Sequence, residues 1–65
     1  MTTATVTRVT GTLAEARPLR EAGLYELVRV GARGLLGEII RFKDEVATLQ
    51  IYEDTTGLAI GAPVV

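Results

Sequence analysis

Cysteine, histidine, serine, asparagine and tryptophan are all missing from this 65-residue sequence, and lysine occurs once, as Lys43. The lack of thiols excludes a disulfide-stapled secreted scaffold and favours an intracellular setting. The lack of histidine and cysteine excludes metal sites built from nitrogen or sulfur ligands. It also excludes the common pairs of a nucleophile and a nitrogen base, so any catalysis would depend on carboxylates, threonine or tyrosine.

Long apolar runs and an excess of one charge are missing too. The longest apolar stretches, such as residues 34–36 and 39–40, fall far short of the roughly 20 residues that span a bilayer. No basic and then apolar signal pattern follows Met1, so we expect a soluble domain without a targeting segment. The net charge of −1 gives no field that would attract a phosphate backbone, so nucleic-acid binding is not expected.

What remains is a short globular sequence, 48% hydrophobic and 23% charged. A chain of this length buries only roughly 60% of its unfolded surface, and such domains usually gain stability from a disulfide, a metal or a partner. We therefore expect one domain over residues 1–65 that has a partner or is part of something larger. The apolar end at residues 61–65 favours a polypeptide that continues beyond Val65.

The first half of the chain predicts three strands. Residues 2–12 are rich in β-branched side chains and should form a strand that turns at Gly11. Residues 13–21 should form a short strand leading into a loop, because Pro18 disfavours a helix there. Residues 25–30 form the third β-rich run.

The next strand is expected at residues 35–43, after a turn over residues 31–34 that has a glycine at each end. Its alternation is imperfect. One face should carry Leu36, Ile40 and Phe42, and the other should carry Ile39, Arg41 and Lys43. Glu38 falls on the first, apolar face, so it should lie near a rim or be paired.

The last part of the chain contains the clearest strand, residues 46–52, in which Ala47, Leu49 and Ile51 alternate with Thr48 and Gln50. A turn should follow at residues 54–57, where Asp and Thr side chains bond nearby amides, and a final strand should run from 58 to 65. Five or six short strands in a chain too small for two packed sheets predict an all-β fold, a small closed barrel.

Few side chains suggest chemistry. The acidic pairs Asp44–Glu45 and Glu53–Asp54 could act as acid and base or bind a hard cation, but both fall at turns, where solvated charge is the favoured interpretation. No glycine spacing matches a phosphate-binding loop.

Two cationic features leave alternatives open. The segment of residues 41–43 has an aromatic residue between two cations, which is also the arrangement of a nucleic-acid surface, although a core position for Phe42 is favoured. Four arginines, Arg17, Arg20, Arg29 and Arg33, would either gather to bind a carboxylate-rich partner or be scattered and solvated.

Three segments together resemble the N-terminal domain of the catalytic A subunit of V/A-type rotary ATPases. They are Gly-Leu-Tyr-Glu-Leu-Val-Arg-Val-Gly at 23–31, Gly-Leu-Leu-Gly-Glu-Ile-Ile-Arg at 34–41, and Gln-Ile-Tyr-Glu-Asp-Thr-Thr-Gly-Leu at 50–58. The resemblance covers nearly the whole chain and, at residues 52–54, is closer to the A than to the B subunit. It carries over eight structural motif positions and no catalytic, cofactor or metal residue. These positions are Gly34, Gly37, Glu38, Tyr52, Glu53, Asp54, Thr55 and Gly57.

The resemblance implies a closed six-stranded barrel that packs against the barrels of neighbouring A and B subunits and holds their alternating ring together. It implies a cytoplasmic, peripheral part of a proton- or sodium-translocating complex, without direct contact with the membrane. ATP and Mg would bind in later domains, so this chain alone would not be an enzyme. The isolated chain should be a marginal monomer or a homo-oligomer.

One position departs from the family pattern, because Asp44 stands where the family usually has glycine. Asp tolerates a positive φ better than most residues, so we expect the turn to survive. Two other functions stay open: a stand-alone barrel that binds nucleic acid or peptide, and a carboxylate enzyme or cation site at Glu53–Asp54.

Overall fold

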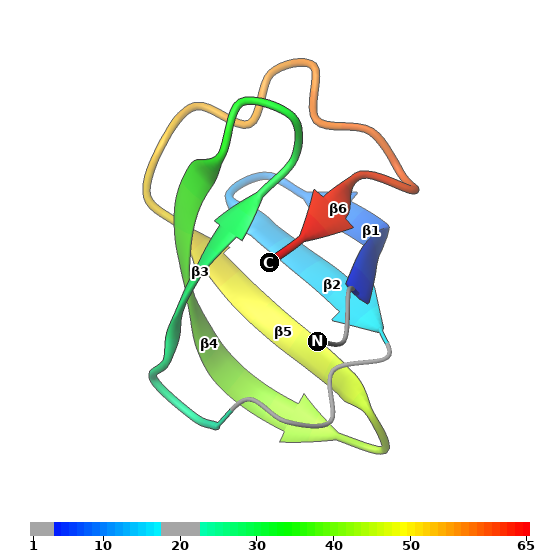
Figure 1. Cartoon of the computed structure of the whole chain (residues 1–65), viewed down its shortest axis with the longest axis vertical. Coiled ribbons are helices and arrows are strands. Elements are labelled where there is room, and N and C mark those ends of the chain that lie inside the picture. Colours follow the sequence, from blue (N-terminus) through cyan, green and yellow to red (C-terminus); the bar gives the residue numbers. More distant parts are fainter. Residues whose placement is uncertain (1–3, 18–22) are drawn as a thin grey trace.

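The computed structural model describes residues 4–17 and 23–65, whose regular structure consists of six strands. The strands are β1 (Ala4–Thr10), β2 (Leu13–Arg17), β3 (Leu27–Val30), β4 (Leu35–Lys43), β5 (Val46–Ile51) and β6 (Pro63–Val64). All neighbouring pairs are antiparallel, and they close in the order β1-β2-β5-β4-β3-β6 (Figure 1). The predicted all-β, closed six-stranded barrel is confirmed. Within the described ranges, no helix is long and apolar enough to cross a membrane.

Three tight connections shape the barrel. Gly11, with φ 60°, turns β1 into β2, and residues 31–34 join β3 to β4 with both glycines at positive φ. Asp44 and Glu45 join β4 to β5 at φ 51° and 69°. Two successive positive φ values are typical of the hairpin turns whose twist matches that of the strands. Asp44 therefore adopts the left-handed conformation that we expected of it.

The core consists of small and medium aliphatic side chains from every strand. The largest completely buried side chains are Ile39, Leu49, Ile51, Val6 and Val30. The predicted inward face of β5 is confirmed, because Ala47, Leu49 and Ile51 are all buried. Both inward residues of β2, Ala14 and Ala16, are alanines, and such small side chains suit the narrow interior of a six-stranded barrel.

The predicted faces of β4 are wrong in its first half. Leu35 and Ile39 point inward and are buried, whereas Leu36 and Glu38 lie on the outside. The pairing of β4 with β5 shifts register between Ile39 and Arg41. Such a bulge adds one residue and exchanges inside for outside, so Phe42 packs against the core beyond it. The core interpretation of Phe42 is confirmed.

Two predicted strand boundaries also need correction. Tyr25 has φ 67°, which breaks an extended run, so the third strand begins at Leu27. The predicted strand over residues 58–65 is reduced to the two residues of β6, because Gly57 and Gly61 adopt positive φ and the chain turns between them. The predictions for Pro18 and Arg20, and for residues 2–3, lie outside the described residues.

Candidate interaction surface

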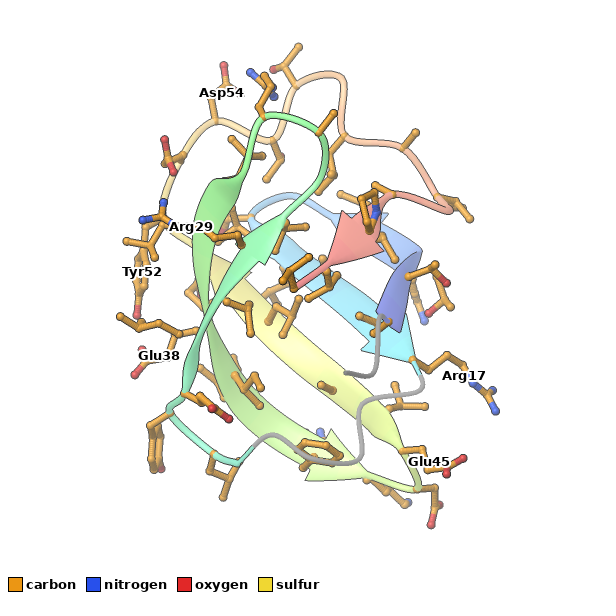
Figure 2. All side chains as sticks on the ribbon, viewed as in Figure 1. Arg17, Arg29, Glu38, Glu45, Tyr52 and Asp54 are labelled. Atoms are coloured by element: carbon orange, nitrogen blue, oxygen red, sulfur yellow. The ribbon has the colours of Figure 1, made fainter. Side chains whose placement is uncertain are left out.

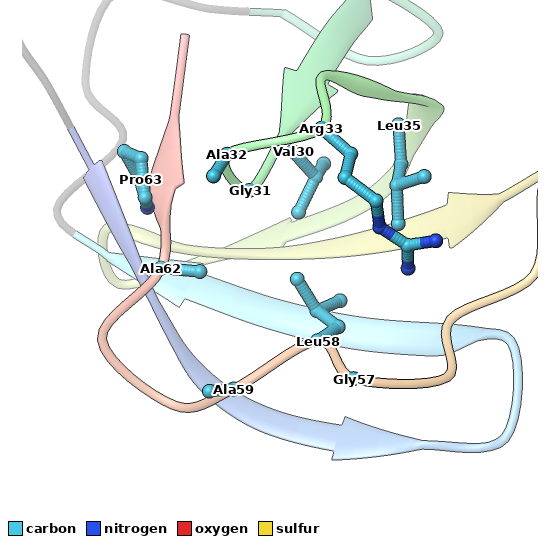
Figure 3. A pocket seen from close by; sticks show the side chains of 10 residues that line it. All are labelled: Val30, Gly31, Ala32, Arg33, Leu35, Gly57, Leu58, Ala59, Ala62 and Pro63. Atoms are coloured by element: carbon cyan, nitrogen blue, oxygen red, sulfur yellow. The ribbon is translucent and has the colours of Figure 1, made fainter.

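Six of the eight motif residues lie in the loop of residues 52–62 or in the β3–β4 turn, which pass each other at one end of the barrel, whereas Gly37 and Glu38 lie within β4. Arg33 joins the two segments: its Nη2 donates to the carbonyl oxygen of Thr56 at 2.6 Å and to that of Asp54 at 3.3 Å. Figure 3 shows this side chain reaching from the turn towards Leu58 and Gly57. From the sequence, Arg33 was grouped only with three other arginines. Its contact with the loop was not predicted, because the contact joins residues that lie far apart in the chain.

Asp54 organises the loop itself. Its Oδ1 accepts hydrogen bonds from the Thr56 hydroxyl at 2.7 Å and from the Thr56 backbone N–H at 2.9 Å. These two bonds, the hydroxyl first, lower the pKa of Asp54 below its usual 3.8, and the charge of Arg33 acts in the same direction. Gly57 then turns the chain with φ 85°. The predicted turn at residues 54–57 is confirmed, with the mechanism expected for an Asp side chain.

Further hydrogen bonds tie the loop to two hairpins. Glu53 Oε2 accepts from the backbone N–H of Leu36 at 2.6 Å, and Tyr52 N–H donates to the Leu36 carbonyl oxygen at 3.0 Å. Thr55 Oγ1 donates to the carbonyl oxygen of Gly11 at 2.8 Å. The loop is thereby bonded both to β4 and to the β1–β2 turn.

Tyr52 and Glu38 form a pair on the outer surface. The Tyr52 hydroxyl donates to Glu38 Oε1. This hydrogen bond, together with partial desolvation and the carboxylate charge, raises the pKa of Tyr52 above its usual 10.0. Tyr52 is nevertheless 56% exposed, and the Cα partner of Glu38 across the β3–β4 pair, Leu27, is 61% exposed. Of the two alternatives predicted for Glu38, a rim position or a pairing, the pairing is observed, and it lies on the outside of the barrel.

The two motif glycines, Gly34 in the β3–β4 turn and Gly37 in β4, allow backbone geometry that a larger residue would disturb. Gly34 has φ 65°, and its carbonyl oxygen accepts from Arg29 Nη1 at 3.3 Å. Gly37 lies inside the barrel, where an added Cβ would meet the carbonyl oxygen of Gln50 at 3.3 Å. Gly37 therefore permits a close approach of β4 to β5.

The arginines do not gather on one side. Figure 2 shows Arg29 and Arg17 on opposite sides of the barrel, so of the two alternatives left open for the arginines, the scattered arrangement holds for this pair. Arg20 lies outside the described residues. Arg33 faces a hollow of about 260 Å³ between the β3–β4 turn and the loop, lined mainly by apolar groups such as Leu35 and Leu58 (Figure 3).

The three motif carboxylates accept hydrogen bonds from the protein's own backbone and hydroxyl groups. Glu53 accepts a hydrogen bond from a backbone N–H, and Asp54 accepts one from a backbone N–H and one from a hydroxyl. Glu38 accepts a hydrogen bond from a tyrosine hydroxyl. Among residues 4–17 and 23–65, no group of three or more acidic side chains is placed to hold a metal ion. The carboxylates of Glu53 and Asp54 therefore help to fix the conformation of the loop.

Comparison with known proteins agrees with this geometry. The sequence model of the ATP synthase alpha/beta family, beta-barrel domain, matches residues 6–65. The V-type ATP synthase alpha chain of Clostridium novyi (strain NT) is 48% identical over 64 residues, covering 98% of this chain and 11% of that protein. The V-type ATP synthase alpha chain 1 of Clostridium tetani (strain Massachusetts / E88) is 48% identical over 63 residues, covering 97% and 11%. The chain thus spans about a tenth of the length of these relatives.

A solved structure of low identity shows the same fold. The ATPase EscN, solved with its central stalk EscO from the type III secretion system of enteropathogenic E. coli, superposes with a TM-score of 0.85. Its identity to this chain is 21%, and the match covers 94% of this chain and 15% of that one. The resemblance drawn from the sequence is confirmed, and the chain belongs to the ATP synthase alpha/beta family, whose β-barrel domain it matches over nearly its whole length.

Proposed function

We propose that this chain is the N-terminal barrel domain, residues 1–65, of the catalytic A subunit of a V/A-type rotary ATPase, and that it holds the alternating A/B ring together. The observation that carries this proposal is the match of residues 6–65 to the family's barrel domain. The relatives named alpha chain share about half of its residues over most of its length. The barrel itself takes no part in catalysis.

The remaining activities belong to the longer subunit that we propose around this barrel. Later domains would bind ATP and Mg and would hydrolyse or synthesise ATP while the complex moves protons or sodium ions. The barrel would lie in the cytoplasm, in a peripheral part of a membrane-associated complex. Its own carboxylates support this division of labour, because those of the motif accept hydrogen bonds within the barrel.

A physical reason for the ring role lies in the exposed apolar side chains. Leu27, Tyr52 and Ile60 are each more than half exposed, at 61%, 56% and 73%. A small barrel buries little core of its own, so burying such side chains against a neighbouring barrel would stabilise both partners.

A stand-alone nucleic-acid module receives no support, because Phe42 packs against the core and leaves no aromatic platform in the segment of residues 41–43.

The proposal is tested by mixing this chain with the N-terminal barrel of the B subunit from the same genome. Size-exclusion chromatography with light scattering should show a mixed complex, and titration calorimetry should show saturable binding. The barrel of EscN, which shares the fold at 21% identity, serves as the control and should not bind. Absence of a mixed complex at millimolar concentration would overturn the assembly role.

A further inference from the structure

The hollow between the β3–β4 turn and the loop of residues 52–62 has apolar walls. Val30 and Leu35, which line it from the barrel, are 0% and 5% exposed. Leu58 and Ala62 line it from the loop side and pack against the core. Figure 3 shows these four side chains directed into a common space of about 260 Å³. Apolar surface gains free energy on leaving water, so these walls suit a short aliphatic chain.

The same hollow carries one positive charge. Of the ten described residues that line it, Arg33 is the charged one. Arg33 donates two hydrogen bonds, both from Nη2, to the carbonyl oxygens of Thr56 and Asp54. A guanidinium has five N–H groups, and those on Nη1 and Nε of Arg33 meet no acceptor among residues 4–17 and 23–65. The hollow therefore combines apolar walls with a cation that has donors to spare.

This combination is complementary to a carboxylate. A guanidinium donates paired hydrogen bonds to a carboxylate, in a geometry that an ammonium group does not match. The Asp54 carboxylate, whose charge interacts with that of Arg33, is bonded to Thr56 and does not line the hollow. Because Nη2 already holds the guanidinium in place, little side-chain freedom would be lost when a ligand binds.

We propose that this hollow binds a small branched aliphatic carboxylate, with its methyl groups between Leu35 and Leu58 and its carboxylate on Arg33. Pockets for drug-sized ligands measure about 300–1,000 Å³, so a hollow of about 260 Å³ suits a smaller molecule. The ligand would join the β3–β4 turn to the loop and hold the two together. This site goes beyond the proposed function and does not depend on it.

The first probe is isocaproate, which has the carbon skeleton of leucine without the amino group, titrated into the isotope-labelled 65-residue chain. The amide resonances of Ala32 and Leu58 should shift saturably at millimolar concentration. That of Thr48, which does not line the hollow, should stay unchanged. Nuclear Overhauser contacts should join the methyl groups of the probe to those of Leu35 and Leu58.

Two analogues separate the charge of the ligand from its aliphatic chain. Isocaproamide keeps the chain and loses the charge, whereas acetate keeps the charge and loses the chain. Each should bind at least about tenfold more weakly than isocaproate, because each gives up one of the two complementary contacts. Absence of a saturable shift with isocaproate, or equal binding of isocaproamide, would overturn the proposal.

Ala59→Glu tests the site without altering Arg33. Ala59 lines the hollow and is exposed, so a carboxylate there would repel the ligand and compete for the guanidinium. It should weaken isocaproate binding at least about tenfold, whereas Ala59→Gln, of similar size and uncharged, should keep most of the affinity. Ile60→Glu is the matched control, since Ile60 is 73% exposed and does not line the hollow. Equal losses in Ala59→Glu and Ile60→Glu, both folded by circular dichroism, would overturn the proposal.

A second probe distinguishes a free acid from the end of a protein chain. N-acetyl-glycyl-leucine carries the same branched chain next to a free carboxylate. It should bind no more tightly than isocaproate, because its other residue would extend out of the hollow into water. Saturation by the peptide without any by isocaproate would overturn the proposal in favour of a protein C-terminus. Saturating isocaproate should also slow hydrogen exchange of the Leu58 amide, which donates to Thr55 within the loop.

Discussion

The wall formed by β2, β5 and β4 and the loop of residues 52–62 are held in place by different forces. In the wall, side chains such as Ile39 and Leu49 are completely buried, and the strands pair along most of their length. In the loop, most side chains are exposed, and its shape depends on hydrogen bonds donated by Arg33, Thr55 and Thr56, the last of them to Asp54.

The two kinds of force contribute differently to the free energy of folding. Burying apolar side chains contributes roughly 1.5–3 kcal/mol each, whereas a hydrogen bond that water can replace contributes about 1 kcal/mol or less. The wall should therefore carry most of the free energy of folding. The loop should open locally while the wall stays folded. Substitutions in the loop should therefore change the shape of the outer surface more than the stability of the barrel.

Leu49→Ala should have the largest effect, because it leaves a cavity in the centre of the wall. Leu49 has 0% of its surface exposed, and removing such a side chain costs about 3 kcal/mol. A domain of this size has roughly 5 kcal/mol of stability in total, so most of it would be lost. Urea unfolding followed by circular dichroism measures the change. Ile60→Ala, at a side chain 73% exposed in the loop, should change the free energy of unfolding by less than about 0.5 kcal/mol.

Gly37→Ala should follow, because an added Cβ has no room inside the barrel. It would lie 3.3 Å from the carbonyl oxygen of Gln50 and 3.6 Å from Ile51 Cγ1, and a backbone carbonyl in a paired strand cannot move aside easily. Overpacking of this kind costs about 1–2 kcal/mol in the free energy of unfolding, measured by the same urea titration. Gly23→Ala is the control, since nothing lies within 4 Å of its added Cβ. An equal loss in both variants would contradict the packing explanation.

The sequence predicted the wall better than the loop, for physical reasons. The alternation of residues 46–51 reports burial directly, so both the strand and its inward face were predicted correctly. The bulge near Ile40 has no marker in the local pattern, so the faces of the first half of β4 were assigned wrongly. The Asp54 turn was predictable because it is local. The contacts of Arg33 with Asp54 and Thr56 were not, because they bring together segments about 20 residues apart.

Arg33→Gln should loosen the loop without unfolding the wall. The shorter side chain loses the bonds to the Thr56 and Asp54 carbonyl oxygens, which join the loop to the β3–β4 turn. Hydrogen exchange of the Leu58 amide, which donates to Thr55, should become several-fold faster. The Leu49 amide should be unchanged, and so should both amides in the control Arg41→Gln, which alters an exposed arginine on β4. Equal acceleration at Leu58 and Leu49 would mean that Arg33 supports the whole barrel.

Acid should have the smallest effect and should act on the loop alone. The hydrogen bonds from Thr56 hold the pKa of Asp54 below 3.8 in the folded chain, so the ionised carboxylate stabilises the loop. This contribution is complete above the unfolded pKa and is lost as the pH falls through the lower, folded value. Carbon-detected titration of the Asp54 carboxyl should give a midpoint below 3.8, accompanied by a shift of the Thr56 amide. Thr56→Val removes the hydroxyl, which is the larger cause, so it should move the midpoint up towards 3.8. An Asp54 midpoint at or above 3.8 in the unaltered chain would show that these bonds do not hold the loop in solution.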